Sequence, residues 1–254
     1  MPSVELRVEE GVGFVVLNRP EKLNALSTEL MEELIAALQK AEAMQEVKVI
    51  AVTGEGRFFS AGADLSEVHR AGSPEEAERT FKTIARLVSV LMGLEKPLIM
   101  ALNGDAYGGG AEMIWTADIV VSVEGAKLVW AEARWGYNAP VLPVIGPWVL
   151  GPSRAAMLAM TIEPLTAKEA HALGIIARLV PDQQALKEEV KKVAKAIMEN
   201  SPQGVRSIKR LLKLSKSSPL IELGLSELQR LSRGQEAKEA ARAFVERRKP
   251  SYSW

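Results

Sequence analysis

The sequence predicts an α/β fold in which a strand-rich core is followed by a helical C-terminal part. Short apolar strands alternate with glycine-containing loops and helices from Val47 to Asp118, a pattern typical of an α/β core. After Asp182 the apolar residues recur only at helical spacing. The chain has 254 residues, enough for one large domain or two modest ones. We therefore predict a core over residues 1–180 and a helical region over residues 181–254.

The first elements are read from alternation, turn residues and caps. Apolar and polar residues alternate over Val4–Val8, and Val12–Leu17 is an apolar run rich in β-branched residues with glycine turn signals at its start. Together the two segments predict a hairpin. Ser27 is the predicted N-cap of a helix whose leucines and alanines have helical spacing. Val47–Thr53 predicts the next strand. The pattern at Ser73–Glu76 predicts a capping box, with proline at the first position of a long helix.

The later elements follow from the same criteria. Three short apolar runs predict strands over Leu98–Leu102, Ile119–Val123 and Ile175–Val180. Helical spacing predicts four helices over Ala185–Met198, Val205–Leu214, Leu220–Leu231 and Ala237–Val245. Helices gathered at one end of a chain often pack on a neighbouring subunit, so we expect a homo-oligomer.

Composition excludes several classes of function. The 32 basic and 32 acidic side chains cancel, so no net charge attracts the molecule to nucleic acid or to an anionic membrane. The absence of cysteine excludes thiol nucleophiles, thiolate metal sites and disulfides. No apolar run reaches the ~20 residues of a membrane span, and the first residues do not resemble a leader. We expect a cytoplasmic protein with no nucleic-acid or membrane partner.

Two glycine-rich segments are the candidates for chemistry. Phe58–Leu65 and Asn103–Met113 each run from a strand through small residues into a helix, where backbone N–H groups can approach a ligand. Their spacing matches neither a P-loop nor a dinucleotide-binding turn. One N–H from each segment could form a two-donor oxyanion hole. Taken alone, each segment could also be a plain glycine-rich turn.

Two glutamates accompany these segments. Glu112 lies one turn into the second predicted helix, and Glu132 follows a strand-like run. A pair of carboxylates around one polarised carbonyl suits acid–base chemistry without a metal. The bulky side chains of Trp130, Trp135 and Tyr137 could line an acyl pocket beside Glu132 or pack in the core.

Four ordered motifs that span nearly the whole chain resemble the enoyl-CoA hydratase/isomerase (crotonase) family. They are Asn18–Pro20 with Asn24–Leu26, Phe59–Leu65, Asn103–Gly104 with Gly108–Glu112, and Phe244–Pro250. The resemblance implies a crotonase-like spiral of β-β-α units with a helical C-terminal trimerisation region, assembled as a homotrimer or homohexamer. It also implies an acyl-CoA thioester substrate. Coenzyme A enters as part of that substrate, and we expect no separate cofactor and no metal.

The resemblance also implies roles for individual residues. The backbone N–H groups of Ala61 and Gly109 match the family's oxyanion hole, and Glu112 and Glu132 match the two glutamates of its hydratases. Because the donors are backbone groups, we expect the side chain of Ser60 to matter little. Residues that match substrate or coenzyme A contacts are Lys22, Ala25, Ala61, Gly62, Ala63, Asp64, Leu65 and Gly109. Candidates for the acyl pocket are Trp130, Trp135, Tyr137 and Phe244.

Retention of both glutamates favours an enoyl-CoA hydratase that adds water across the double bond of a 2-enoyl-CoA. The segment Trp135–Pro143 departs from the family's usual Pro-Gly-x-Gly-Gly turn, so a Δ3,Δ2-enoyl-CoA isomerase, or a hydrolase or decarboxylase of CoA thioesters, stays open. From another class, the chain could be a non-catalytic RNA-binding or scaffold protein, although such a protein has no need of both glutamates. We interpret the basic helix Val205–Lys216 as a solvated face.

Overall fold

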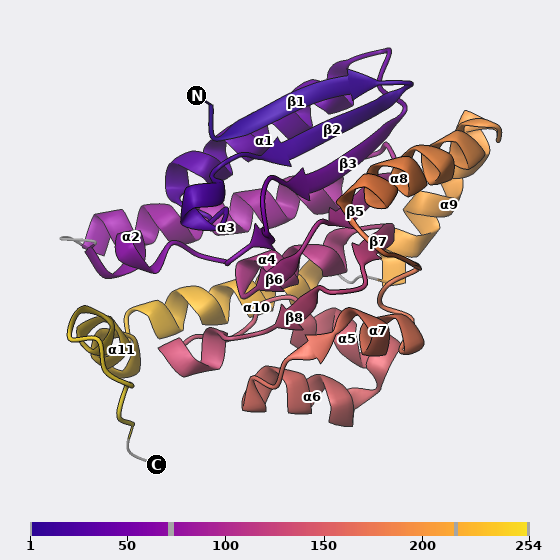
Figure 1. Cartoon of the computed structure of the whole chain (residues 1–254). Coiled ribbons are helices and arrows are strands. Elements are labelled where there is room, and N and C mark those ends of the chain that lie inside the picture. Colours follow the sequence, from indigo (N-terminus) through magenta and orange to yellow (C-terminus); the bar gives the residue numbers. More distant parts are fainter. Residues whose placement is uncertain (1, 71–73, 216–217, 253–254) are drawn as a thin grey trace.

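The computed structural model describes residues 2–70, 74–215 and 218–252, which form two sheets surrounded by helices (Figure 1). The strands of the six-stranded sheet are, in spatial order, β1 (Val4–Glu9), β2 (Val12–Leu17), β3 (Val49–Gly54), β5 (Leu98–Leu102), β7 (Ile119–Val123) and β10 (Arg178–Val180). Those of the four-stranded sheet are β4 (Phe58–Ser60), β6 (Asp105–Tyr107), β8 (Lys127–Val129) and β9 (Leu165–Thr166). The predicted N-terminal hairpin is confirmed, because β1 and β2 pair antiparallel.

Successive strands alternate between the two sheets. β3 is followed by β4, β5 by β6 and β7 by β8, and the first strand of each pair joins the larger sheet while the second joins the smaller. Within each sheet these strands run parallel. A helix follows both β4 and β6 before the chain returns to the larger sheet. The expected spiral of β-β-α units is therefore confirmed.

The helices that the sequence predicts begin and end close to the predicted positions, whereas those over Leu142–Leu150 and Pro152–Thr161 were not predicted. They are α1 (Thr28–Ala43), α2 (Leu65–Arg70), α3 (Pro74–Gly93), α4 (Gly109–Met113), α5 (Leu142–Leu150), α6 (Pro152–Thr161), α7 (Ala167–Ala172), α8 (Gln183–Met198), α9 (Pro202–Ser215), α10 (Ser218–Ser232) and α11 (Gln235–Val245). Short 3-10 segments cover Pro20–Lys22, Ile114–Thr116 and Glu132–Trp135. The Ser27 hydroxyl accepts the N–H of Leu30 as predicted, whereas the predicted cap Ser73 lies outside the described residues. In the part of the chain that is described, no helix is long and apolar enough to cross a bilayer.

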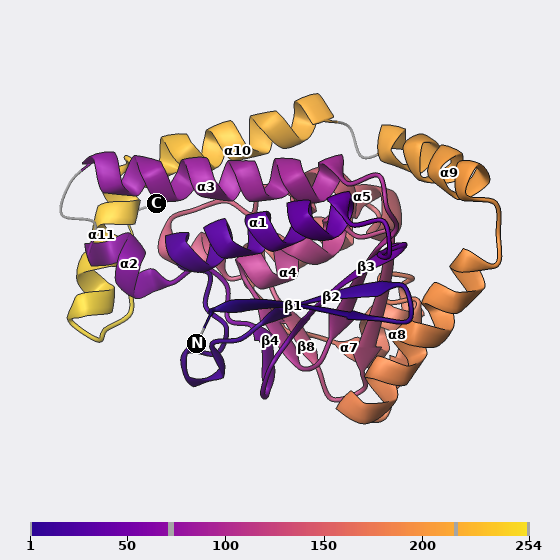
Figure 2. The same ribbon diagram turned by 90° about the horizontal axis from the view of Figure 1, so that it is seen from above.

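The larger sheet is covered on both faces (Figure 2). α1 packs on β1, β2 and β3, α3 packs on α1, and α10 packs on α3. α8 covers the other face and buries Leu186, Val190 and Ala194 against the strands. Coverage of both faces explains why β2 and β5 are apolar throughout rather than alternating. The first of the four C-terminal helices thus belongs to the core.

The orientation of α9 differs from our interpretation of a solvated basic face. Lys209 is only 4% exposed, and its ammonium group lies 2.6 Å from the carboxylate of Asp118. The ammonium group of Lys213 donates to a backbone carbonyl of the residue that follows α3. Ile208 and Leu211 are instead 60% and 65% exposed. The interpretation was wrong for these two lysines, because their long side chains reach inward to anchor the helix while its apolar residues face outward.

Candidate active site

A cavity of about 340 Å³ lies between α3, α4, α10 and the 3-10 segment Glu132–Trp135. Most of its wall is apolar, with α3 contributing Ile84 and Leu87 and α10 contributing Leu228. Both Glu112 and Glu132 line the same cavity. The fold therefore brings together the two glutamates that the sequence places twenty positions apart.

Glu112 is buried on α4 and is held by the beginning of α5. It is 4% exposed, and its Oε2 accepts the N–H of Val141 at 2.5 Å. The N–H of Leu142 lies 3.2 and 3.3 Å from the two carboxylate oxygens. Burial, followed by the nearby charge of Glu132, raises the pKa of Glu112 well above its ordinary value, although the two N–H groups oppose that rise. The carboxyl of Glu112 is thus fixed in place by backbone donors.

Glu132 approaches the cavity from the end of β8. A Cβ atom on Gly108 would lie 3.5 Å from its Oε1, an ordinary van der Waals distance, so the carboxyl lies beside the glycine-rich turn. Its Oε2 is buried and accepts no hydrogen bond from the described residues. Burial raises the pKa of Glu132 to about 7. Because two neighbouring carboxyls disfavour double ionisation, we expect this pair to hold a proton near neutral pH.

The two glycine-rich segments meet at one edge of the cavity. Gly62 has a positive φ of 83°, and a Cβ atom there would lie 2.6 Å from the carbonyl oxygen of Tyr107 and 3.0 Å from the nitrogen of Gly109. Only glycine allows this approach. The nitrogen of Ala63 in turn would lie 3.8 Å from a Cβ atom on Gly109. Among the hydrogen bonds of the described residues, neither the Ala63 nor the Gly109 N–H has an acceptor, and both residues line the cavity.

The structure contradicts one of the two donors that the resemblance implied. The N–H of Ala61 donates to the carbonyl oxygen of Leu23 at 2.9 Å, so it is not free to bind a ligand. The N–H of Asp64 donates to the carbonyl oxygen of Leu26 at 3.2 Å, which leaves the N–H of Ala63 between these two bonds. The available donor therefore lies two residues further along the same motif.

Two of the four aromatic candidates do not line the cavity. Trp130 is fully buried beside Trp115, with 5.8 Å between the ring centroids, so its predicted place in the acyl pocket is wrong. Phe244 is 37% exposed and packs edge-on against Trp135 at 5.9 Å. It contacts Trp135, which lines the cavity, but is not itself part of the lining.

Trp135 and Tyr137 do line the cavity, together with residues that sequence reasoning missed. The ring of Tyr137 lies 5.8 Å from that of Phe81 on α3, and burial raises the pKa of Tyr137 to about 12. Met31 on α1 also lines the wall. Helical spacing indicated that α1 and α3 each bury one face, but gave no signal that these faces border a cavity rather than a closed core.

Of the remaining predicted contacts, only Leu65 is part of the cavity lining. Gly62 is buried in the turn, and Asp64 is partly buried and accepts hydrogen bonds from the first residues of α2. Lys22 is exposed on its 3-10 turn and Ala25 is half-buried, and neither borders the cavity. Their contact with coenzyme A stays a prediction.

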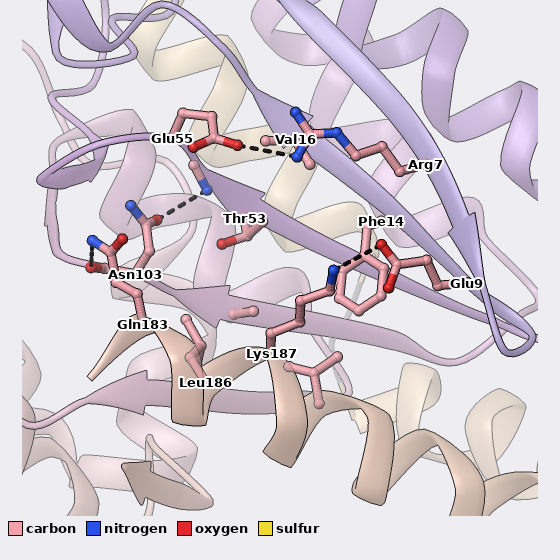
Figure 3. A pocket seen from close by; sticks show the side chains of 13 residues that line it. Arg7, Glu9, Phe14, Val16, Thr53, Glu55, Asn103, Gln183, Leu186 and Lys187 are labelled. Carbon is pink, nitrogen blue, oxygen red and sulfur yellow. Dashed lines mark hydrogen bonds and ion pairs between the residues drawn. The ribbon is translucent and has the colours of Figure 1, made fainter. Parts of the chain in front are cut away.

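A second hollow of about 150 Å³ lies between the larger sheet and α8 (Figure 3). Its charged side chains are already paired, Arg7 with Glu55 at 3.1 Å and Glu9 with Lys187 at 2.7 Å. Elsewhere in the described part of the chain, no three His, Asp or Glu side chains gather as a metal-binding cluster. The carboxyls of Glu112 and Glu132 and the open N–H donors make the cavity of about 340 Å³ the candidate active site.

Comparisons with known proteins identify the family by sequence and by fold. The sequence model of the enoyl-CoA hydratase/isomerase family matches residues 7–253. A Thermus thermophilus protein provisionally named an enoyl-CoA hydratase is 36% identical, over 97% of this chain and 100% of that protein. The 1,2-epoxyphenylacetyl-CoA isomerase of Escherichia coli is 32% identical, over 100% and 99% of the two chains. The solved structure of EchA1_1 from Mycobacterium paratuberculosis superposes with a TM-score of 0.86 at 29% identity, covering 100% of this chain and 99% of that one. The chain therefore belongs to the enoyl-CoA hydratase/isomerase family.

Proposed function

We propose that the chain is an enoyl-CoA hydratase, which adds water across the double bond of a 2-enoyl-CoA to give a 3-hydroxyacyl-CoA. One observation carries this proposal: the buried carboxyl of Glu112 and the partly buried carboxyl of Glu132 border the same cavity as the open N–H groups of Ala63 and Gly109. The reaction needs each of these groups. It also balances without a redox or metal cofactor, since coenzyme A enters with the substrate.

The two N–H groups would bind the thioester oxygen. Attack at the β-carbon moves negative charge onto that oxygen, so donors aimed at it stabilise the transition state more than the substrate. Each such donor contributes ~10²–10³ in rate in known oxyanion holes. In this proposal the pair is Ala63 and Gly109, with Ala63 replacing Ala61 because the N–H of Ala61 is already hydrogen-bonded.

The two carboxyls would divide the transfer of protons. The pair holds one proton before the reaction, and we assign the ionised state to Glu112 because backbone N–H groups bind both of its oxygens. Ionised Glu112 then accepts a proton from water as the water oxygen bonds to the β-carbon, and protonated Glu132 gives its proton to the α-carbon. One water is consumed, and the pair as a whole keeps the same number of protons. A pKa of about 7 suits Glu132 to this role, because a group with that pKa is readily protonated and deprotonated near neutral pH.

The test follows the substrate's chromophore. Hydration removes the conjugation between the double bond and the thioester, so absorbance should fall with crotonyl-CoA or with a longer or aromatic enoyl-CoA. Mass spectrometry should then find a product heavier by one water. Unchanged absorbance with every 2-enoyl-CoA would contradict the proposal.

A second candidate is a Δ3,Δ2-enoyl-CoA isomerase, which one feature of the site favours. Both oxygens of Glu112 accept backbone N–H groups, whereas Glu132 keeps a buried oxygen with no partner among the described residues. Moving a double bond can be done by a single base that removes the α-proton of a 3-enoyl-CoA and returns it at the γ-carbon. A 3-enoyl-CoA would then gain conjugated absorbance without a change in mass.

A non-catalytic role agrees less well with the site. Burying two ionisable carboxyls side by side costs stability, as their raised pKa values indicate. An RNA-binding or scaffold surface gains nothing from that cost. RNA binding would in addition weaken steeply with salt, which a titration at two ionic strengths would detect.

A further inference from the structure

We propose that the hydroxyl group of Ser60 is a positioning group that fixes the direction of the Ala63 N–H. The inference rests on the proposed oxyanion hole and adds to it a side chain that touches no substrate. From the sequence we expected Ser60 to matter little, because the hole's donors are backbone groups. The hydrogen bonds around Ser60 argue otherwise.

The hydroxyl group holds the residue that precedes the donor. Ser60 is fully buried at the end of β4, and its Oγ accepts the N–H of Gly62 at 3.1 Å. The carbonyl oxygen of Gly62 accepts the N–H of Leu26 at 2.8 Å. That carbonyl and the N–H of Ala63 belong to one planar peptide group. Fixing both polar groups of Gly62 therefore fixes where the Ala63 N–H points.

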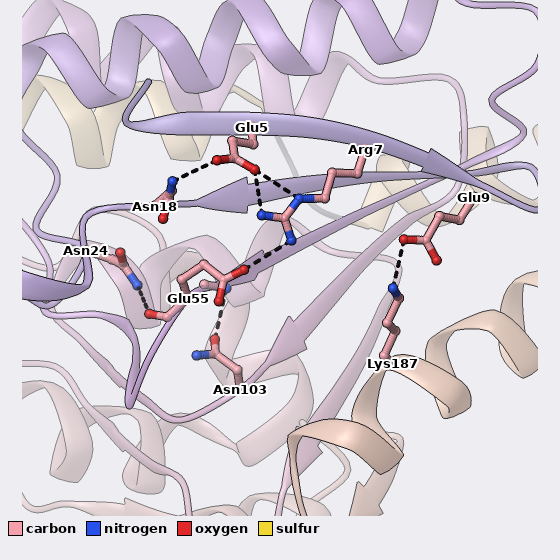
Figure 4. A network of polar contacts seen from close by, with 9 residues as sticks. Glu5, Arg7, Glu9, Asn18, Asn24, Glu55, Asn103 and Lys187 are labelled. Carbon is pink, nitrogen blue, oxygen red and sulfur yellow. Dashed lines mark hydrogen bonds and ion pairs between the residues drawn. The ribbon is translucent and has the colours of Figure 1, made fainter. Parts of the chain in front are cut away.

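The hydroxyl is itself held by a rigid partner. Ser60 Oγ donates to the carbonyl oxygen of Asn24 at 2.8 Å. Asn24 is fully buried, and its side-chain amide donates to the carbonyl oxygens of Glu55 and Phe58 at 2.9 Å each (Figure 4 shows the first of these bonds). Its left-handed φ of 53° is one that asparagine tolerates better than most residues. Ser60 thus links the hydrogen-bonded turn at Asn24 to the backbone of the oxyanion hole.

Ser60 also contacts the segment that supplies the other donor. It pairs with Ala106 of β6, the strand that leads into α4. A Cβ atom on Gly110 would lie only 2.8 Å from the Cβ of Ser60, so α4 begins directly against this side chain. Gly110 follows Gly109 directly, so the small side chain of Ser60 packs between the segments that supply the Gly109 and Ala63 N–H groups. A larger side chain at position 60 or position 110 would move the two N–H donors apart.

The test compares two buried serines. Ser60→Ala removes the hydrogen bond to the Gly62 N–H, so the backbone at Gly62 can tilt and turn the Ala63 N–H away from the substrate. We expect kcat to fall ~10- to 100-fold, as for a misplaced donor, while KM changes by less than about threefold. Ser122 is equally buried on β7, and its hydroxyl donates to the Val123 carbonyl oxygen at 3.0 Å, outside the cavity wall. Ser122→Ala should leave kcat within about twofold. Ser60→Cys, which keeps a weak donor of similar size, should fall between wild type and Ser60→Ala.

A second measurement reports the hole without any reaction. Infrared spectra of a bound saturated acyl-CoA, with ¹³C at the thioester carbonyl, should show a lowered C=O frequency in the wild type and in Ser122→Ala. The lowering should be smaller in Ser60→Ala. A Ser60→Ala protein with the wild-type C=O frequency and kcat would overturn the inference. An equal loss of kcat in Ser122→Ala would also overturn it. If the wild type itself shows no lowering, the proposed hole is wrong and this inference fails with it.

Discussion

Glu112 and Glu132 line one cavity, but backbone N–H groups of a distant segment bind both carboxylate oxygens of Glu112 and leave one buried oxygen of Glu132 without a partner among the described residues. These donors are the N–H groups of Val141 and Leu142 at the beginning of α5. Backbone donors favour the ionised form of a carboxyl, and an apolar environment favours the protonated form. The site therefore distinguishes two chemically identical side chains by what surrounds each of them.

The burial of Glu132 predicts a pH-dependent gain in stability when it is replaced. Its pKa rises from 4.5 to about 7 on folding, so the folded state binds this proton more tightly than the unfolded chain. Folding stability is therefore lost as the pH rises from about 4.5 through about 7. Glu132→Gln removes this loss and should stabilise the protein by up to ~3 kcal/mol at pH 8, and by much less at pH 5. Thermal unfolding at the two pH values measures the difference.

The control for that experiment is Glu163→Gln, which changes an exposed glutamate in the turn after α6. Its effect on the melting temperature should be small and similar at both pH values. Equal effects of Glu132→Gln at pH 5 and pH 8 would contradict the raised pKa.

The Gly109 donor can be removed without disturbing the helix that it begins. Proline suits the first residue of a helix, so Gly109→Pro keeps a plausible backbone while deleting the N–H, and kcat should fall by at least ~10². Gly109→Ala keeps the N–H, and its Cβ would lie 3.2 Å from the flexible end of Leu26. This matched variant should retain most of the activity. A folded Gly109→Pro protein with near-normal turnover would remove Gly109 from the mechanism.

The exposed apolar residues predict a trimer or hexamer. Trp148 and Met160 are 78% and 76% exposed on α5 and α6, and Leu211 is 65% exposed on α9. Ile208, three positions before Leu211 on the same helix, is 60% exposed, and a contiguous exposed apolar patch of this kind marks a protein interface. Light scattering should give three or six chain masses. Leu211→Asp should lower that mass, while Arg210→Ala on the same helix should not, and a wild-type mass of one chain at micromolar concentration would refute the assembly.

The sequence predicted the fold well because its signals are local. Ser27 caps a helix, the first hairpin pairs as predicted, and the four C-terminal helices lie where the apolar spacing placed them. These features depend on a few adjacent residues. The spiral of β-β-α units was implied by the motifs of the family rather than by any local pattern, and the alternation of strands between two sheets was not predicted.

The site was predicted less completely because contacts between distant segments decide it. No pattern near Ala61 indicates that its N–H is taken by Leu23, nor that Trp130 packs on Trp115 instead of the cavity. Lys209 likewise lies in a basic helix, but its partner Asp118 is far away in sequence. Each error concerns a residue whose partner is more than ten positions away.

The two glutamates can be assigned by comparing two substrates. Hydration needs both carboxyls, so Glu112→Gln should lower the hydration rate of a 2-enoyl-CoA by ~10²–10⁴, the usual size of a general acid–base contribution. Moving the double bond of a 3-enoyl-CoA needs one base, and its rate should fall much less in this variant. Glu132→Gln should damage both reactions. Steady-state kinetics of the two folded variants on both substrates provides the measurement.

Two results would reverse the assignment. If Glu112→Gln leaves hydration intact, Glu112 only holds the beginning of α5 through Val141 and Leu142, and its role is structural. If the wild type converts a 3-enoyl-CoA but not a 2-enoyl-CoA, the chain is an isomerase. In that case the segment Trp135–Pro143 becomes the feature that best separates this chain from the hydratases, because its first residues line the cavity directly after Glu132.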